Sequence, residues 1–393
     1  MKVLVTGIGC VSAVGTNVND HLLSFQEKKS GLGPVTLFPT NHTEPVAEVK
    51  LSNTALKNKL GLPEQAVISR TALLGMLAAR EAFEDADLSG VTSPRIGLIS
   101  SNSTGGMDLS EHFYPEFRQD PTRGNLHDIA SHDPGDSTER IAGLLRLNGF
   151  RTTISTACSS AANAIMLGAR LIRQGMLDIV IAGGTDALCK FTLNGFGSLL
   201  ILDQMPCRPF DASRAGLNLG EGAGYLVLQS EESARRKAYC TLAGYANAND
   251  AFHQTASSSD GNGAYLAMKG ALEKAGLSPD TIDYINAHGT GTPNNDASES
   301  AAIQRLFRDH IPPFSSTKAF TGHTLGAAGG VEAVFSVLAL HHGILYPNLN
   351  FNQPIPETGL IPVTDYQTGV PLRSVLSNSF GFGGNNTSLL FRK

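Results

Sequence analysis

The sequence predicts an α/β fold built from two similar halves. Amphipathic helical segments alternate along the chain with short apolar strands, which is typical of sheets whose faces are covered by helices. The plan of the first half is then repeated in the second, and each half contains one Gly- and Ala-rich segment that is apolar all round. Because a helix apolar on every side is buried, we expect these two helices to pack together at the centre of the molecule.

The duplication is visible in matched segments. Each half contains an amphipathic helix, then a strand, then a loop of small residues. These segments are residues 71–89, 95–100 and 103–106 in the first half, and 263–278, 283–287 and 289–292 in the second. The stretches AFEDADLS and ALEKAGLS, which end the two helices, are near copies.

The central helices and the closing Gly-rich turns and strands repeat as well. The matched pairs are residues 155–172 with 321–338, and residues 220–228 with 381–391. We place the boundary in the polar segment 230–237, which predicts an N-terminal half of residues 1–232 and a C-terminal half of residues 233–393. The main asymmetry is segment 108–140, which is rich in His, Asp and Pro and is interpreted as an insertion in the first half.

Composition excludes several classes of function. With 393 residues, 41% of them hydrophobic, the chain can bury a large core. A net charge of −5 and a pI near 6.1 leave no basic footprint for nucleic acid or a membrane surface. The N-terminal stretch MKVLVTGIG indicates a strand and a turn, not a signal peptide. We also expect no membrane-spanning helix, because no apolar run reaches about 18 residues.

Cysteine and histidine usage points to a cytoplasmic protein without a metal site. The cysteines are odd in number and form no CxxC pair, which favours reduced thiols over disulfides; they are residues 10, 158, 189, 207 and 240. The 11 histidines show no HxxxH or HExxH spacing, so the sequence predicts no metal centre.

Cys158 is the first candidate for chemistry. It directly precedes the helix of residues 159–172, where the helix dipole favours a thiolate. Its neighbours on both sides are small, so the sulfur can stay accessible. A buried structural cysteine is the alternative, and it is our interpretation of the other four cysteines.

Two histidines are candidates to join Cys158. His288 ends a strand beside a Gly/Thr loop, although a satisfied core histidine would fit this position too. His323 lies in the turn before the second apolar helix, which makes it the repeat's counterpart of Cys158. If the halves pack about a pseudo-twofold axis, Cys158 and His323 converge where the central helices meet.

Charged and flexible residues flank this set. Glu332 lies in an apolar helix and therefore needs a partner, for which Lys318 is the natural candidate. The run Gly381–Gly384 beside Phe380 is either a structural turn or a mobile loop that carries an aromatic gate and a backbone N–H.

These motifs together resemble the β-ketoacyl synthase family of the thiolase superfamily. The similarity covers residues 1–393, and the motifs fall in family order: Thr156–Ser160 (nucleophile), Arg208–Asp211, Gly220–Gly224, Ala287–Pro293 (first histidine), Ser316–Glu332 (lysine and second histidine) and Asn378–Gly384 (gating loop). The pattern is that of elongating synthases with a Cys-His-His site, whereas initiating synthases use Cys-His-Asn.

The resemblance implies a thiolase fold, a duplicated five-layered α-β-α-β-α sandwich that is usually a homodimer. It implies that Cys158 takes an acyl chain from the phosphopantetheine arm of an acyl carrier protein. Malonyl-carrier protein then loses carbon dioxide, and the resulting carbanion attacks the thioester. The enzyme would need no cofactor of its own, and its partners would be the carrier protein and a second subunit, which is either an identical copy or a chain-length partner.

The resemblance also implies roles for individual residues. His288 and His323 would donate through Nε2–H to the enolate oxygen, since decarboxylation needs such donors and no strong base. The backbone N–H groups of Cys158 and Phe380 would form a second oxyanion hole for the tetrahedral acyl adduct. Lys318 and Glu332 would together hold the two histidines in place. Thr290 and Thr292 would hydrogen-bond the pantetheine arm. The gate would consist of Phe380, Gly381, Phe382 and Gly383.

Departures from the family pattern leave the acyl substrate open. The tripeptide Arg214-Ala215-Gly216 stands where Arg-Asp-Gly is common before the Gly-Glu-Gly turn. Asn385 stands where Thr is usual, and segment 131–140 is unusually polar. Fatty acid elongation is the first interpretation, and a ketosynthase of a specialised polyketide or aryl polyene pathway is the alternative.

Two other enzyme classes fit less well. A degradative thiolase uses a Cys-His-Cys set, but no cysteine follows Cys240. A dinucleotide-binding oxidoreductase is disfavoured because Ser12 replaces the third glycine of the Gly7–Gly15 run.

Overall fold

The computed structural model describes residues 1–91, 93 and 95–393. Its strands form one ten-stranded sheet system in the order β10-β9-β11-β12-β8-β1-β7-β6-β4-β5. In the first half these are β1 (Val3–Ser12), β4 (Ile96–Ser101), β5 (Arg151–Ile154), β6 (Ile179–Asp186) and β7 (Gly222–Ser230). In the second half they are β8 (Cys240–Asn249), β9 (Tyr284–Asn286), β10 (Phe314–Ser315), β11 (Ser374–Gly381) and β12 (Asn385–Arg392).

The two halves have the same strand order. From the centre outward, the first half runs β1-β7-β6-β4-β5 and the second half runs β8-β12-β11-β9-β10. The strands of the two halves are joined where β1 pairs antiparallel with β8, at Leu4 with Thr241 and Val5 with Cys240. The predicted duplication is therefore present in the topology. A separate two-stranded ladder joins β2 (Leu32–Gly33) to β3 (Val46–Ala47).

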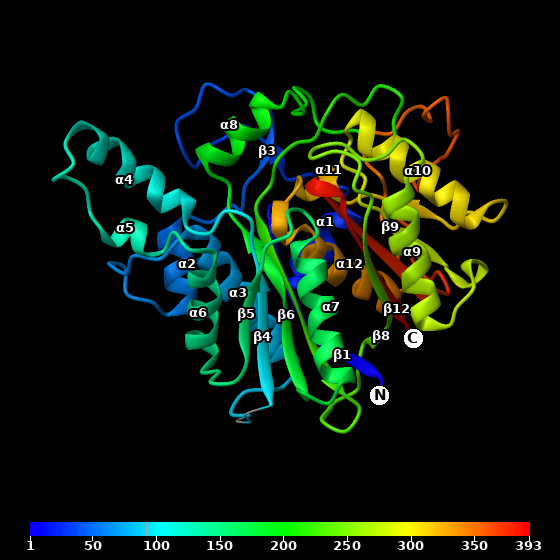
Figure 1. Ribbon diagram of the computed structural model, residues 1–393, viewed down its shortest axis with the longest axis horizontal. Helices are drawn as coiled ribbons and strands as arrows, with labels where there is room; N and C mark the ends of the chain where they lie inside the picture. The colour runs from blue at the N-terminus through cyan, green and yellow to red at the C-terminus, as the bar shows by residue number, and fades with distance from the viewer. Residues whose placement is uncertain (92, 94) are drawn as a thin grey trace.

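Helices form the other layers (Figure 1). Their bounds are α1 (Val18–Gln26), α2 (Asn53–Leu60), α3 (Arg70–Asp85), α4 (Met107–Gln119), α5 (His127–Ala130), α6 (Pro134–Leu145), α7 (Ser160–Arg173), α8 (Lys190–Ser198), α9 (Asn262–Ala275), α10 (Pro293–Phe307), α11 (Lys318–Thr321) and α12 (Ala328–His342), with 3₁₀ turns η1 (Pro279–Thr281), η2 (Leu325–Ala327) and η3 (Phe382–Gly384). Helices α7 and α12 contact each other and strands of both halves, whereas α3 packs on β1, β6 and β7 and α9 packs on β8 and β12. This is the α-β-α-β-α layering.

The central helices approach as closely as their small residues allow. A Cβ added to Gly329 of α12 would lie 2.8 Å from the backbone nitrogen of Ala162 in α7, and one added to Gly330 would lie 2.4 Å from the carbonyl oxygen of Gly224. Any larger side chain at these two positions would therefore separate α12 from its neighbours. The Gly- and Ala-rich pattern is thus a requirement of this packing.

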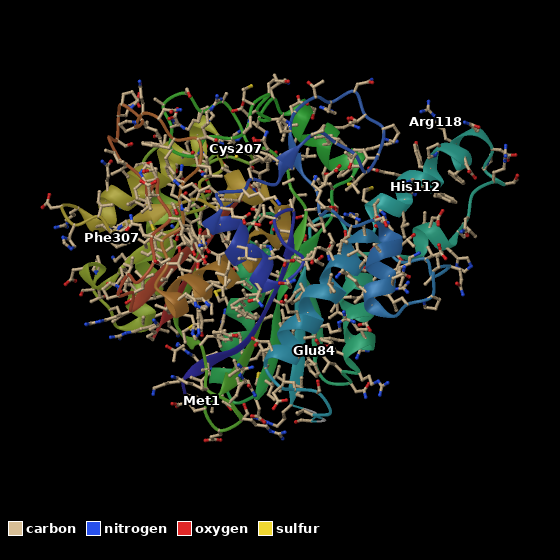
Figure 2. All side chains as sticks on the ribbon, turned by 180° about the vertical axis from the view of Figure 1, so that it is seen from behind. Met1, Glu84, His112, Arg118, Cys207 and Phe307 are labelled. Carbon is tan, nitrogen blue, oxygen red and sulfur yellow. The ribbon has the colours of Figure 1, made fainter. Side chains whose placement is uncertain are left out.

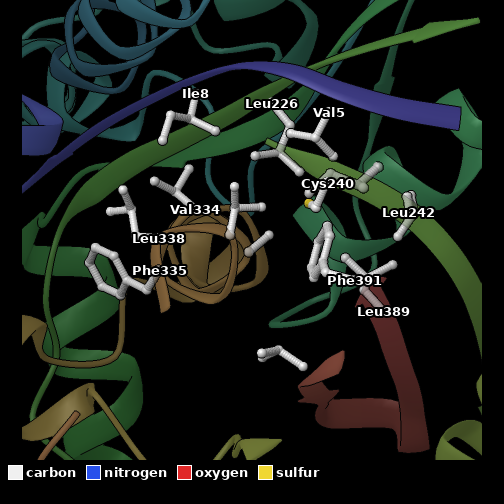
Figure 3. Close-up of a cluster of buried hydrophobic side chains, with 14 of the residues drawn as sticks. Val5, Ile8, Leu226, Cys240, Leu242, Val334, Phe335, Leu338, Leu389 and Phe391 are labelled. Atoms are coloured by element: carbon white, nitrogen blue, oxygen red, sulfur yellow. The ribbon is translucent and has the colours of Figure 1, made fainter. Parts of the chain in front are cut away.

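The hydrophobic core around α12 joins the two halves. Figure 3 shows Val334, Phe335 and Leu338 of α12 beside Val5 and Ile8 of β1. The same cluster includes side chains from the second half, namely Leu242, Leu389 and Phe391. A core shared in this way makes the relative position of the halves, and hence the site between them, part of the fold.

One helical stretch passes a simple test for a membrane span. The helical stretch Leu325–His342 has 18 residues and is apolar enough, by length and composition, to cross a membrane. However, 89% of it is buried inside the protein, and the core helix of a soluble protein passes the same test. The stretch is not the continuous apolar run that the sequence analysis sought, because Glu332, Ser336 and two terminal histidines interrupt it.

Most of segment 108–140 forms an arm that projects from the body, whereas its last residues, from Pro134, begin α6, which packs against α3. Helices α4 and α5 extend away from the sheet in Figure 1, and Figure 2 shows His112 and Arg118 on this projection. At its base, the Glu111 carboxylate accepts the backbone N–H groups of Lys190 and Phe191 and so caps the start of α8. The arm therefore agrees with the interpretation of this segment as an insertion.

Candidate active site

Cys158 lies in a tight turn between β5 and α7, here called the nucleophile turn (Thr156–Ser160). Ala157 adopts a left-handed φ of 53°, which is strained for a residue with a side chain. The Ser160 hydroxyl holds this turn, because it accepts the Thr156 N–H at 2.8 Å and donates to the Ala157 carbonyl oxygen. The turn places Cys158 directly before the helix, as the sequence predicts, with 6% of its surface exposed.

The expected thiolate at Cys158 is wrong for the substrate-free enzyme. Burial raises the pKa of the thiol to about 11, because a buried charge loses its hydration. The charge of Lys318 and the backbone N–H groups of Phe382 and Cys158 lower the pKa, but burial outweighs them. The sequence argument counted the helix dipole and could not count the desolvation. At neutral pH Cys158 is therefore a thiol.

The two candidate histidines meet at the same place. His288 follows β9, and His323 lies in the turn between α11 and η2. Their ring centroids are 5.4 Å apart with the rings at 87°, and each residue is 2% exposed. Burial, together with the charge of Lys318, holds the pKa of both rings well below the ordinary value. Both histidines are therefore neutral at neutral pH.

The hydrogen bonds of the two rings fix which nitrogen carries the proton. The Lys318 ammonium lies 3.3 Å from His288 Nδ1, and because an ammonium can only donate, Nδ1 must accept. The Leu325 N–H donates to His323 Nδ1 at 3.1 Å. In each neutral ring the hydrogen is therefore on Nε2. Both histidines present an N–H donor, as the sequence argument required of them.

Lys318 and Glu332 form the buried ion pair that the sequence predicts. Their side chains are 1% and 4% exposed, and the ammonium also donates to the carbonyl oxygen of His288. Burial raises the pKa of Glu332 to about 7, while the adjacent ammonium acts in the opposite direction. The pair thus places a cation beside His288 in contact with its own acidic partner.

The loop after β11 adds one group near Cys158 that the sequence argument did not name. The backbone N–H of Phe382 acts on the Cys158 sulfur and lowers the pKa of the thiol. Phe380 is still inside the β-ladder, paired with Asn386, and its ring lies 5.7 Å from the ring of His288. Because β11 continues to Gly381, Phe382 is the first residue after the strand.

The glycine loop (Gly381–Gly384) closes over the nucleophile turn. A Cβ on Gly381 would lie 3.1 Å from the Cys158 nitrogen, so no larger residue fits there without displacement. Gly383 and Gly384 have φ of 79° and 72°, which favours glycine. The Phe382 ring stacks on Phe196 of α8, with centroids 5.8 Å apart.

The predicted chemistry-bearing residues line one cavity of about 210 Å³. Cys158, His288 and His323 lie in its wall with Thr290 and Thr292, whose hydroxyl oxygens are 2.9 Å apart. Phe380, Gly381 and Phe382 line it too, whereas Gly383 does not. Lys318 and Glu332 stand behind the histidines.

Sequence reasoning missed the acidic residues that hold the histidine loop. The Glu299 carboxylate of α10 accepts the N–H groups of His288 at 2.9 Å and Gly289 at 2.8 Å, and the side-chain amide of Asn378 at 3.1 Å. One turn earlier, Asp296 accepts the N–H of Phe210 at 2.7 Å. The available signal was two acids at i, i+3 spacing beside apolar helix positions. Among the described residues, no group of three or more His, Cys, Asp or Glu side chains could hold a metal ion.

Family models match almost the whole chain. The β-ketoacyl synthase N-terminal domain matches residues 1–234, and the β-ketoacyl synthase C-terminal domain matches residues 239–352. This chain belongs to the β-ketoacyl synthase family. The family predicted from the sequence is thereby confirmed, and with it the class of enzyme, an acyltransferase that forms carbon–carbon bonds.

Curated relatives agree over their full length. The chain is 32% identical over 408 residues to 3-oxoacyl-acyl-carrier-protein synthase 2 of Staphylococcus aureus (strain MRSA252), covering 100% of this chain and 98% of the relative. It is 34% identical over 411 residues to the Synechocystis sp. protein of the same name, with the same coverage of both chains.

Solved structures confirm the thiolase fold of the ketosynthases. The ishigamide ketosynthase/chain length factor superposes with a TM-score of 0.93 at 31% identity, covering 100% of this chain and 99% of that one. A ketosynthase in complex with its chain length factor from Xenorhabdus doucetiae gives a TM-score of 0.88 at 34% identity, covering 100% and 98%.

Proposed function

We propose that this enzyme is a β-ketoacyl-acyl-carrier-protein synthase whose nucleophile is Cys158 and whose oxyanion donors are His288 and His323. The observation that carries the proposal is their convergence on one cavity with both Nε2 atoms protonated. A thiol beside two neutral N–H donors is suited to acyl transfer followed by decarboxylation, and a proton-abstracting base is not required.

The first half-reaction transfers the acyl chain to Cys158. The sulfur attacks the acyl thioester on the carrier, the carbon–sulfur bond to pantetheine breaks, and the thiol proton of Cys158 ends on the departing pantetheine sulfur. The oxyanion of the tetrahedral adduct is bound by the N–H groups of Cys158 and Phe382, both of which act on the sulfur in the resting enzyme. Phe382 replaces Phe380 in this role.

The second half-reaction extends the chain. Malonyl-carrier protein loses carbon dioxide, and the electrons of the broken bond pass into an enolate whose oxygen is bound by His288 and His323. The enolate carbon attacks the acyl thioester, and Cys158 leaves as the thiolate and is reprotonated. Because the pKa values of both histidines are held well below the ordinary value, both keep the tautomer that donates through Nε2.

The walls of the cavity suit the carrier's arm. Thr290 and Thr292 offer adjacent hydroxyls to the amides of phosphopantetheine, and Thr292 is fixed because its Oγ1 accepts the Asn295 N–H at 3.3 Å as the cap of α10. The partner is an acyl carrier protein, the reaction needs no cofactor held by the enzyme, and the location is the cytoplasm.

Fatty acid elongation is the pathway we propose, in a homodimer. The curated relatives named 3-oxoacyl-acyl-carrier-protein synthase 2 support it. A ketosynthase of a polyketide or aryl polyene pathway is the second candidate, because two similar solved proteins are a ketosynthase with a chain length factor. Co-expression with its genomic neighbours, followed by size-exclusion chromatography and mass spectrometry, separates a homodimer from a heterodimer.

The test of the reaction is acylation of the intact enzyme. After incubation with an acyl-carrier protein, mass spectrometry should find one acyl adduct on a peptide containing Cys158 and none in Cys158→Ala. The buried cysteines Cys10 and Cys207 serve as internal controls. An adduct on either of them in place of Cys158 would refute the assignment of the nucleophile.

A further inference from the structure

Asn385 stands where the glycine loop ends and β12 begins. Its side-chain oxygen Oδ1 lies within hydrogen-bond distance of three donors: Ser159 Oγ at 2.8 Å, Asn163 Nδ2 at 3.0 Å and Asn247 Nδ2 at 2.7 Å. The single hydroxyl hydrogen of Ser159 is shared with the Thr156 carbonyl oxygen, also at 2.8 Å. Ser159 directly follows Cys158, and Asn163 lies one turn further along α7. One carboxamide therefore connects the end of the glycine loop to the nucleophile turn across the boundary between the two halves.

The donors of this cluster are themselves held in place. Asn163 Nδ2 also donates to Thr156 Oγ1 at 2.9 Å, and its oxygen accepts the Thr387 hydroxyl at 2.8 Å. Asn247 Nδ2 reaches Thr387 Oγ1 at 2.8 Å. Because each side chain orients the next, such a network fixes the position of its acceptor more firmly than separate bonds would.

The opposite side of the glycine loop is attached to an exposed segment instead. The Gly383 carbonyl oxygen accepts from Asn249 Nδ2 at 2.7 Å, and the Gly383 N–H donates to the Gln254 carbonyl oxygen at 2.7 Å. Asn249 and Gly383 are both exposed. The loop thus has one anchor on the nucleophile turn and another on a surface segment, and the surface anchor is the one that can be released toward solvent.

We propose that Asn385 is a positioning residue: it holds the start of β12 on the first turn of α7, so that the glycine loop pivots there and returns the Phe382 N–H to the Cys158 sulfur. The inference rests on the proposed role of Cys158. It also gives a meaning to the departure from the family pattern. A threonine oxygen is attached directly to Cβ, one bond nearer the backbone than Asn Oδ1, so threonine cannot reach all three donors.

The test measures the reactivity of Cys158 without any carrier-bound substrate. The full-length enzyme is treated with iodoacetamide at about pH 8 and at about pH 10, and mass spectrometry identifies the alkylated cysteine. A hydrogen bond to a thiolate contributes roughly one pKa unit, so Asn385→Ala and Asn385→Thr should slow alkylation of Cys158 about tenfold at each pH. Unchanged alkylation in both variants would overturn the inference.

A double-variant cycle excludes a general loss of structure. Asn247 is exposed and contacts the site through Asn385, Asn163 and Thr387, so Asn247→Ala should slow alkylation by about threefold. The combined variant should be no slower than Asn385→Ala alone, whereas multiplied effects would show independent action and contradict the inference. Asn58→Ala, on the exposed face of α2, is the matched control and should leave the rate unchanged. Alkylation of wild type at a cysteine other than Cys158 would count against the proposed function itself.

Discussion

The turns before α7 and α12 occupy equivalent places in the two halves, yet they are held in different ways. Each contains a non-glycine residue with a left-handed φ, 53° at Ala157 and 52° at Leu325. The α12 turn is fixed by backbone bonds, since the His323 N–H donates to the Asn218 carbonyl oxygen at 2.7 Å and its own carbonyl oxygen accepts the Gly220 N–H at 2.9 Å. The α7 turn is closed by the glycine loop of the other half.

The difference matches what each turn must do. In the proposed reaction Cys158 meets two substrates in succession, so the part that covers it must be able to move. His323 is proposed to present one N–H at a fixed point, and its turn is bonded to the segment that leads into β7. The duplicated fold places the starts of α7 and α12 side by side. The Cys158 turn is covered by a loop that can move, whereas the His323 turn is held by backbone hydrogen bonds.

Both turns share one electrostatic feature. Burial favours the neutral forms, since it raises the pKa of Cys158 to about 11 and lowers that of His323 well below its ordinary value. Lys318 acts on both groups, since its charge lowers the pKa of the thiol and also that of the imidazole. A single buried cation thus makes the nucleophile more reactive and the donor more securely neutral.

The largest effect is expected from removing the nucleophile. Cys158→Gln should lower condensation by at least about 10⁴-fold, because loss of a nucleophile removes the covalent route. It should keep malonyl decarboxylation, since the amide mimics an acylated cysteine and both histidines remain. Carbon dioxide release and 3-oxoacyl product are measured in the same reaction, with Cys158→Ala as the comparison. Loss of both activities in a folded Cys158→Gln protein would contradict the division of labour between the turns.

The next largest effect is expected from removing either of the two histidine N–H donors. His288→Ala and His323→Ala should each lower malonyl decarboxylation by about 10²–10³-fold, the usual cost of one oxyanion donor. Acylation of Cys158 should fall less, because its oxyanion is bound by backbone N–H groups. The two rates are measured separately by carbon dioxide release and by intact mass. Equal losses in both steps would show that the histidines also serve the nucleophile turn.

A smaller effect on the rate of malonyl decarboxylation is expected from removing the charge of Lys318. Lys318→Met removes the cation that lowers the pKa of Glu332, so the buried carboxyl takes up a proton. Unfolding in urea should show a loss of about 1–3 kcal/mol, the cost of buried polar groups left without their partner. The double variant Lys318→Met/Glu332→Leu removes both charges and should recover most of that stability. The double variant should still decarboxylate malonyl-carrier protein about tenfold more slowly than wild type. Without the Lys318 ammonium, His288 Nδ1 is no longer held as an acceptor, and the proton can move there from Nε2. If the double variant decarboxylates as fast as wild type, Lys318 and Glu332 contribute to stability alone.

The comparison also shows what the sequence could and could not predict. The repeated pattern of small residues before two apolar helices was sufficient to place Cys158 and His323 together, and the isolated acid in α12 identified Lys318 as its partner. Which aromatic residue donates to the sulfur depends on where β11 ends, and pattern does not fix a strand end to within two residues. The role of Glu299 is hidden because a buried acid on α10 has the same sequence signature as a solvated one.

The smallest expected effect distinguishes the two aromatic residues of the glycine loop region. Phe382 has its N–H near the sulfur and stacks on Phe196, whereas Phe380 is packed in the β-ladder against His288. Phe382→Ala should therefore loosen the cover and raise unprimed malonyl decarboxylation relative to condensation by about fivefold, which corresponds to about 1 kcal/mol. Phe380→Ala should instead lower decarboxylation by disturbing His288, and leave the order of substrates intact. The ratio of the two rates is the measurement, and melting temperature controls for folding. If Phe380→Ala raises the ratio and Phe382→Ala does not, the gate lies at Phe380 and the loop does not pivot as its contacts indicate.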